Sequence, residues 1–87
     1  MRLSEKALVD AVRDWSLEYK TLDIRSSVHE KYTSVSFILG DEYSVDIRSM
    51  DSDFCLFLEK GVRCTASAQD FATLDALLIE VHHVVHG

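Results

Sequence analysis

The chain has 87 residues, of which 47% are hydrophobic and 28% are charged, and its formal net charge at pH 7 is −6. This length and composition are typical of one small folded domain over residues 1–87 and exclude an intrinsically disordered chain. Because nine basic residues stand against fifteen acidic ones without a basic cluster, we do not expect direct binding to nucleic acid.

Hydrophobic residues never form a run of about 20, the length that spans a bilayer, so no membrane insertion is expected. The first residues, MRLSEKALVDAVRDW, lack the apolar stretch of a secretory signal peptide, which favours a cytoplasmic protein. In that reducing compartment Cys55 and Cys64 are expected to remain thiols. A two-residue turn after the strand of Cys55 would place Cys64 opposite Phe57, which is too far from Cys55 for an unstrained bridge.

A first helix is predicted by hydrophobic residues that recur with helical spacing near the N-terminus. Ser4 is a suitable N-cap, and Glu5 places a carboxylate in the first turn, where the backbone N–H groups favour negative charge. The apolar stripe consists of Leu8, Ala11, Val12, Trp15 and Tyr19. The polar residues fall outside this stripe, so the helix is expected to cover a core with one face.

From Thr21 onward the hydrophobic pattern changes to alternation, which predicts β-strands. Four alternating runs, separated by short polar turns, occupy residues 22–28, 33–39, 43–47 and 54–58. We interpret them as an antiparallel meander of three to five strands, in which the strands at either end are the weaker ones.

Alternation also predicts how the strands pair. A three-residue turn over residues 40–42 would pair Phe37 with Val45 and keep the apolar side chains on one face, whereas a two-residue turn would separate them. A following turn of two or four residues, centred on Met50 and Asp51, is expected to align Ile47 with Phe54 and Val45 with Leu56, again with the apolar residues on the same face.

A second helix is predicted at the C-terminal end. Ser67, with Asp70 three residues later, resembles an N-terminal capping arrangement. The apolar stripe of this helix consists of Phe71, Leu74, Leu77, Leu78, Val81, Val84 and Val85. The order helix, antiparallel sheet, helix predicts an α+β fold of two layers, in which both helices cover the same face of the sheet.

Acidic residues are concentrated in the central strands and their turns. Residues 1–40 contain equal numbers of acidic and basic residues, whereas residues 41–59 contain six acidic residues and one arginine. Four of the six fall in predicted turns and two on the face without helices: Asp41, Glu42, Asp51 and Asp53 in turns, Asp46 and Glu59 on the face. Nearly the whole net charge therefore belongs to the centre of the sheet.

The same uncovered face is expected to carry Ile38, Phe57 and Tyr32 among small hydroxyls and carboxylates. Apolar side chains with a rim of one charge sign are typical of a protein-binding patch. The alternative is that acidic turns only keep the protein soluble and that the exposed apolar residues have no role.

If this face binds a partner, its charge favours a basic surface. Enzymes that handle nucleic acids present such surfaces, so we expect a small acidic inhibitor or immunity-type protein. It would be similar in size, charge and layout to toxin-immunity proteins and to phage-encoded blockers of CRISPR or restriction systems. The residues expected to contact the partner are Tyr32, Ile38, Asp41, Glu42, Asp46, Asp51, Asp53, Phe57 and Glu59.

Self-association is the first alternative function, as in a homodimeric chaperone or a structural adaptor. Two copies could meet through the uncovered face or through an edge strand, either residues 22–28 or residues 62–65. Charge opposes the face-to-face arrangement, because the two copies of Asp46 would approach each other.

The C-terminal sequence IEVHHVVHG offers a second alternative, metal binding. His82 and His86 have the i, i+4 spacing at which one helix presents two imidazoles to a metal, and Asp75 lies on the same side of the helix. Against this, the glutamate of an H-E-x-x-H motif is absent, and the helix dipole alone favours histidines near a helix C-terminus. No nucleophile elbow or glycine-rich phosphate loop occurs, so neither an enzyme nor a cofactor is expected.

Overall fold

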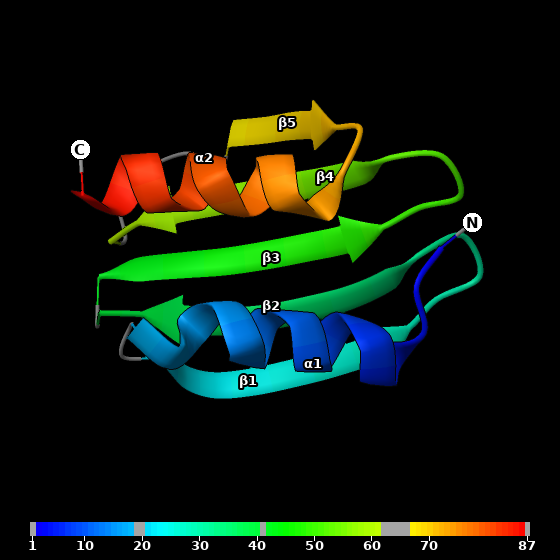
Figure 1. Ribbon diagram of the computed structural model, residues 1–87, viewed down its shortest axis with the longest axis horizontal. Helices are drawn as coiled ribbons and strands as arrows, with labels where there is room; N and C mark the ends of the chain where they lie inside the picture. Colours follow the sequence, from blue (N-terminus) through cyan, green and yellow to red (C-terminus); the bar gives the residue numbers. More distant parts are fainter. Residues whose placement is uncertain (1, 19–20, 41, 62–66, 87) are drawn as a thin grey trace.

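The computed structural model describes residues 2–18, 21–40, 42–61 and 67–86. Its elements are α1 (Glu5–Trp15), a 3-10 turn η1 (Ser16–Glu18), β1 (Thr21–Val28), β2 (Thr33–Leu39), β3 (Tyr43–Ser49), β4 (Phe54–Lys60), β5 (Ser67–Phe71) and α2 (Leu74–His86). The five strands form one antiparallel sheet in the order β1-β2-β3-β4-β5 (Figure 1). The predicted α+β order of helix, meander and helix is therefore confirmed.

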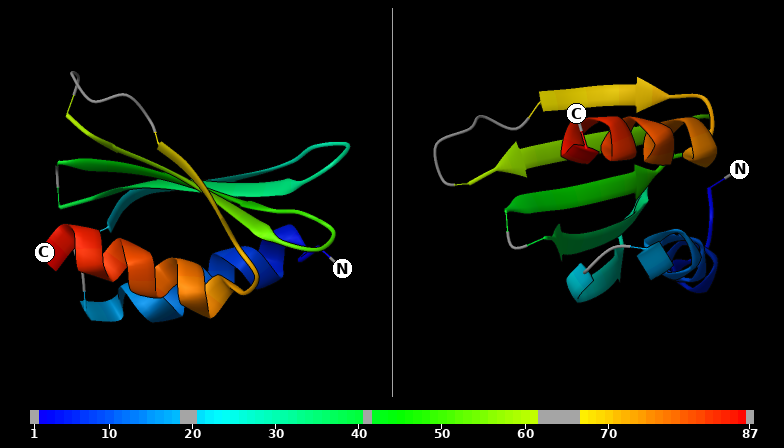
Figure 2. Two further views of the ribbon diagram at one scale, coloured as in Figure 1. Left: turned by 90° about the horizontal axis from the view of Figure 1, so that it is seen from above. Right: turned by 60° about the vertical axis from the view of Figure 1, so that its left-hand side comes forward.

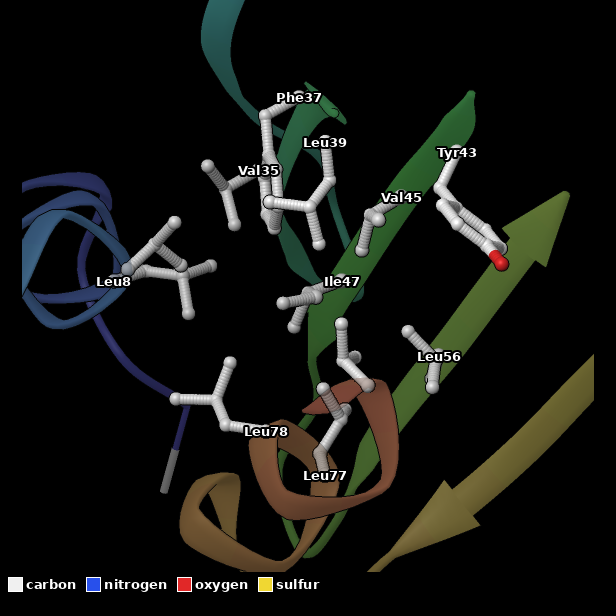
Figure 3. Close-up of a cluster of buried hydrophobic side chains, with 12 residues drawn as sticks. Leu8, Val35, Phe37, Leu39, Tyr43, Val45, Ile47, Leu56, Leu77 and Leu78 are labelled. Atoms are coloured by element: carbon white, nitrogen blue, oxygen red, sulfur yellow. The ribbon is translucent and has the colours of Figure 1, made fainter. Parts of the chain in front are cut away.

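Both helices lie on one side of the twisted sheet, as Figure 2 shows. The core fills the space between the two helices and the sheet. It consists of Leu8, Val12, Val35, Phe37, Leu39, Tyr43, Val45, Ile47, Leu56, Leu77, Leu78 and Val81. Figure 3 shows side chains from α1 and α2 meeting those of β2, β3 and β4. Alternate residues of the central strands point to this core, so the residues between them point to the opposite side of the sheet.

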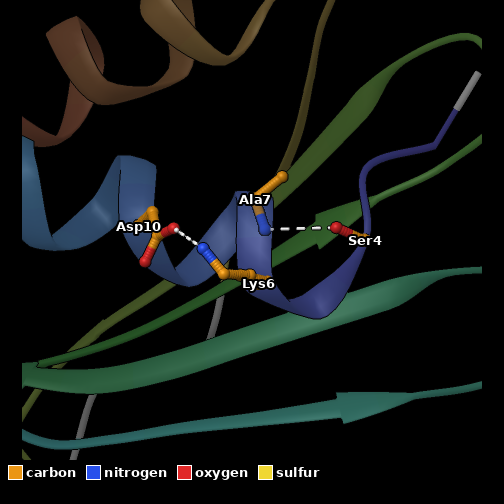
Figure 4. Close-up of polar contacts among 4 residues, drawn as sticks. All are labelled: Ser4, Lys6, Ala7 and Asp10. Carbon is orange, nitrogen blue, oxygen red and sulfur yellow. Dashed lines mark hydrogen bonds and ion pairs between the residues drawn. The ribbon is translucent and has the colours of Figure 1, made fainter.

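Helix α1 begins where the sequence predicts. The Ser4 hydroxyl accepts a hydrogen bond from the Ala7 backbone N–H at 3.2 Å, which satisfies one N–H group of the first turn (Figure 4). Lys6 and Asp10, one turn apart on the exposed side, form an ion pair at 3.2 Å. This pair stabilises the helix by at most about 0.5 kcal/mol, because both side chains are solvated.

Packing of α1 on the sheet follows the predicted apolar stripe. Leu8 and Val12 are fully buried, and the ring of Trp15 lies 6.3 Å from that of Phe37, centroid to centroid. Tyr19, the last residue of the predicted stripe, lies outside the described residues. Burial of this stripe, rather than helix propensity alone, holds an 11-residue helix in place.

Strand register is confirmed at one turn and corrected at the next. Phe37 pairs with Val45 across the predicted three-residue turn. Ile47, however, pairs with Leu56 and not with Phe54, because the turn between β3 and β4 spans four residues, 50–53, and is closed by a backbone hydrogen bond of 2.9 Å. The two-residue shift leaves every side chain on its predicted face.

The start of the second helix was predicted wrongly. Ser67–Phe71 forms strand β5, and α2 begins at Leu74, where the Thr73 hydroxyl accepts a hydrogen bond from the Ala76 N–H at 3.1 Å. Pairing with β4 places Phe54 opposite Phe71. This pairing satisfies the backbone groups at the edge of β4, a tertiary contribution that outweighs the local capping pattern.

The pairing of β4 with β5 sets the neighbours of Cys55 and Phe57. Phe57 pairs with Ala68, and Cys55 pairs with Asp70. Cys64 and the proposed edge strand over residues 62–65 lie outside the described residues. No helix in the described part of the chain is long and apolar enough to cross a membrane.

Candidate protein-binding site on the open sheet face

The face of the sheet opposite the helices, here called the open face, is formed by alternate residues of β2, β3 and β4. Strand pairing sets these side chains in three rows across the sheet: Ser34, Arg48 and Cys55; Ser36, Asp46 and Phe57; Ile38, Ser44 and Glu59. Side chains in one row are direct cross-strand neighbours and come within contact distance. Strand alternation therefore brings residues from three separate segments into one surface.

A groove of about 560 Å³ runs over the open face. It is lined by Asp23, Arg25, Ser36, Phe37, Ile38, Ser44, Val45, Asp46, Arg48, Phe57 and Glu59. Ile38 and Phe57 are partly buried, whereas Ser44 and Glu59 are exposed. The groove thus combines apolar side chains with hydrogen-bonding and charged groups, and its volume lies within the usual range for ligand sites.

Strand β1 contributes to the groove through an irregularity that the sequence pattern did not predict. The pairing of β1 with β2 shifts between Leu22 and Arg25, and Asp23 at this bulge has a φ of 55°. Aspartate tolerates this left-handed conformation better than most residues. As a result Asp23 and Arg25, both exposed, line the same groove as Ile38.

Arg48 stands at the centre of the open face. Its guanidinium carbon lies 4.6 Å from the ring centroid of Tyr32 and 4.4 Å from that of Phe57. Its Nε lies 3.6 Å from Oδ2 of Asp46, an ion pair in which the two side chains are 34% and 35% exposed. The Nε itself is buried and has no hydrogen-bond partner among the described residues. Two cation–π contacts and one ion pair therefore hold this arginine in place.

Asp46 is partly withdrawn from water by its position in the groove. This desolvation raises the pKa of the Asp46 carboxyl above its ordinary value of 3.8, and the charge of Arg48 opposes the rise only in part. A carboxylate that is short of solvation is stabilised further by any cation that enters the groove.

Tyr32 also contacts His29, and both residues belong to the turn between β1 and β2. The imidazole of His29 stacks on the Tyr32 ring with 4.4 Å between centroids. Oγ of Ser27 lies 2.8 Å from His29 Nε2 and 2.7 Å from Oγ of Ser34. Arg2 donates hydrogen bonds to the backbone carbonyls of this turn, at 2.8 and 3.1 Å. These contacts fix the position of the Tyr32 ring at one end of the open face.

Of the predicted contact residues, Ile38, Asp46, Phe57 and Glu59 come together in the groove, and Tyr32 joins them through Arg48. The turn acids do not join them. Glu42 lies in the turn between β2 and β3, and Asp51 and Asp53 lie between β3 and β4, at opposite ends of the sheet (Figure 1). Asp41 lies outside the described residues.

Charge in the groove is mixed, whereas the sequence predicted a rim of one charge sign. Three carboxylates and two guanidinium groups line it: Asp23, Asp46, Glu59, Arg25 and Arg48. The position of Arg48 two residues after Asp46 was a signal for their shared face, because strand side chains alternate. The stacking of Arg48 between rings from two other segments had no such signal.

The C-terminal histidines lie on α2, away from the open face. The rings of His82 and His86 are 4.6 Å apart between centroids, and both residues are exposed. Asp75 lies in the first turn of α2, at the opposite end of the helix from His86. Among the residues that the structure describes, no three metal-binding side chains are grouped to hold an ion.

Cys55 is buried on the open face beside Asp70 and is a free thiol. Burial raises the pKa of the Cys55 thiol, and Asp70 raises it further through a hydrogen bond and through its charge. The thiolate, which is the nucleophilic form, is thus disfavoured, so Cys55 is suited to packing and not to nucleophilic chemistry.

Comparison of the chain with protein-family models, with curated proteins and with solved structures found no match.

Proposed function

We propose that this protein is a binding module that docks a basic surface of a partner protein through the groove of the open face. The observation that carries the proposal is the groove itself, an accessible hollow in which Ile38 and Phe57 lie beside the partly desolvated Asp46. Apolar anchors surrounded by polar groups are the usual composition of an interface centre.

Preorganisation supports the same function. Arg48 is held between Tyr32 and Phe57, so the aromatic rings are ordered before a partner arrives. Ordered side chains lose less conformational entropy on binding, which leaves more of the contact energy for affinity. Aromatic residues and arginine are also the residue types that contribute most to protein interfaces.

Net charge supports a basic partner. The chain carries −6, nearly all of it within residues 41–59, and Glu42, Asp51 and Asp53 extend the negative potential to both ends of the sheet. Such a field accelerates the approach of a positively charged protein and repels nucleic acid. A partner whose basic surface binds nucleic acid would then be blocked, which is the action of an inhibitor or immunity-type protein.

Differential capture tests the docking surface. The wild-type chain, Phe57→Ala and Glu59→Lys are immobilised and exposed to one cell lysate, and the retained proteins are compared by mass spectrometry. Phe57→Ala should lower retention of the partner at least about tenfold, because it removes the apolar anchor. Glu59→Lys should lower it several-fold at low salt and less at high salt.

Matched controls separate the open face from the rest of the surface. Val84→Ala alters an exposed apolar residue on α2, and Asp10→Lys reverses an exposed charge on α1. Both should retain the partner as well as the wild type does. Equal retention by all five proteins would contradict docking through the open face.

The inhibitory action needs a separate assay with the captured protein. If that protein binds nucleic acid, a DNA duplex should compete with the chain for it, because both would occupy the same basic surface. Simultaneous binding of duplex and chain would refute inhibition and leave the docking surface unaffected.

A further inference from the structure

A second groove, of about 630 Å³, is lined by residues of α1 and α2. Both helices lie on the side of the sheet away from the open face (Figure 2). Its apolar lining consists of Ala11, Trp15, Leu74, Leu78 and Ile79. Ile79 is 57% exposed, although it is one of the largest aliphatic side chains of α2. Ala11, Trp15 and Leu74 are partly exposed as well, whereas Leu78 is 6% exposed. A partly accessible apolar lining is typical of a surface that a partner covers.

The spacing of apolar residues on the two helices explains this groove. Leu8 and Val12 of α1, and Leu77 and Val81 of α2, are fully buried against the sheet. The residues beside them on each helix therefore face the space between the helices instead of the sheet. On α1 this position is occupied by Ala11, whose methyl group leaves that space open.

Charge at the groove has one sign. Asp14 of α1 and Asp75 of α2 are the charged residues that line it within the described part of the chain, and both are exposed. Asp14 lies in the last turn of α1, where the helix dipole disfavours a carboxylate, so its charge does not serve the stability of the helix. A basic group in the groove would be attracted from both walls.

We propose that the groove between α1 and α2 binds a basic amphipathic helix of a partner protein, with its apolar face against Trp15, Leu74 and Ile79. Its lysine or arginine side chains would lie near Asp14 and Asp75. Two helices form the walls, and a third helix laid between them is a recurrent way to cover such a groove. This proposal is independent of the function assigned to the open face.

The charges also argue against two other occupants. A second copy of this chain would bring two molecules of net charge −6 together, with the two carboxylates of each groove at the contact. An anionic lipid surface would be repelled by the same carboxylates. A cationic apolar segment is the occupant that the groove attracts.

Trp15 provides a direct readout, because it is the single tryptophan of the chain and lines the groove. The probe is a synthetic helical peptide of about 15 residues, made of leucine, alanine and lysine, with the leucines on one face. The control peptide has glutamate in place of lysine. Titration of the intact protein with the lysine peptide should shift Trp15 emission with a saturable curve, and the glutamate peptide should not.

Four variants test where the peptide binds. Ile79→Lys should weaken binding of the lysine peptide at least about tenfold, because it removes an apolar contact and adds repulsion. Asp14→Lys should weaken it about fivefold in low salt without harming the fold, since a cation suits that helix end. Val84→Lys, which makes the same change elsewhere on α2, should bind as the wild type does, and so should Phe57→Ala on the open face.

The proposal is overturned if the lysine peptide leaves Trp15 emission unchanged up to about 1 mM, or if the glutamate peptide binds equally well. It is also overturned if sedimentation shows a dimer that Ile79→Lys converts to monomers, because the occupant would then be a second copy. None of these results bears on capture through the open face, which Phe57→Ala tests separately.

Discussion

Replacement of Arg48 by alanine should destabilise the fold and disorder the open face. Two cation–π contacts, with Tyr32 at 4.6 Å and with Phe57 at 4.4 Å, are lost. Each contributes about 0.5–1 kcal/mol at a partly exposed site. The ion pair with Asp46 adds less than about 1 kcal/mol, because both side chains are about one-third exposed and water screens their attraction. The expected loss in the free energy of unfolding is about 1–3 kcal/mol.

Urea denaturation followed by Trp15 fluorescence measures this loss. A domain of 87 residues has a total stability of about 4–13 kcal/mol, so the expected change moves the midpoint clearly while the urea dependence stays constant. Arg48→Lys keeps the charge but loses the planar group that stacks on both rings, and should recover less than half of the loss.

The cost of Arg48→Ala should also fall as the pH is lowered through the pKa of Asp46. Protonation makes Asp46 neutral, so the ion pair no longer contributes and only the cation–π part remains. A cost below about 0.5 kcal/mol at neutral pH, or full recovery by lysine, would refute the account of a stacked arginine that orders this face.

Three further predictions concern polar groups that are wholly or partly buried. Ser49→Ala should lower stability by about 1–2 kcal/mol, because the fully buried Ser49 hydroxyl accepts the Leu3 N–H at 2.9 Å; Ser52→Ala, on an exposed turn, should not. Since the folded state raises the pKa of Asp46, the wild type should lose stability relative to Asp46→Asn as the pH rises above 3.8 through that pKa, and the opposite trend in a urea series would contradict this. In a Cys64→Ser background Cys55 should be alkylated more slowly in the native than in the urea-unfolded protein, and Asp70→Asn should accelerate the native reaction; an unchanged rate would contradict the role of Asp70.

The central strands could be predicted because one face of each is buried. Val35, Phe37, Val45 and Ile47 alternate with polar residues, and a register slip by one residue would expose all of them. The register between β3 and β4 was less determined, because a shift of two residues keeps the same face. The choice between the two alignments depends on which residues form the turn, and the structure places it at residues 50–53.

Strand β5 could not be predicted from its own residues. The sequence SAQDF has no clear alternation and resembles a helix start, and its strand conformation depends on the unpaired edge of β4. Only part of the groove on the open face could be predicted from the sequence. Ile38, Asp46 and Phe57 follow from alternation, whereas Asp23 enters through a bulge and Arg48 is fixed by rings that lie far from it in the chain.

Site-specific photo-crosslinking in cells tests the central claim, docking through the groove of the open face, and it works before the partner has been identified. A photoreactive amino acid replaces Ser44, which is exposed in the groove, or Val84, which is exposed on α2. The account predicts a discrete covalent adduct with one partner protein from position 44 and no such adduct from position 84. Absence of an adduct at position 44, or the same adduct from both positions, would contradict it.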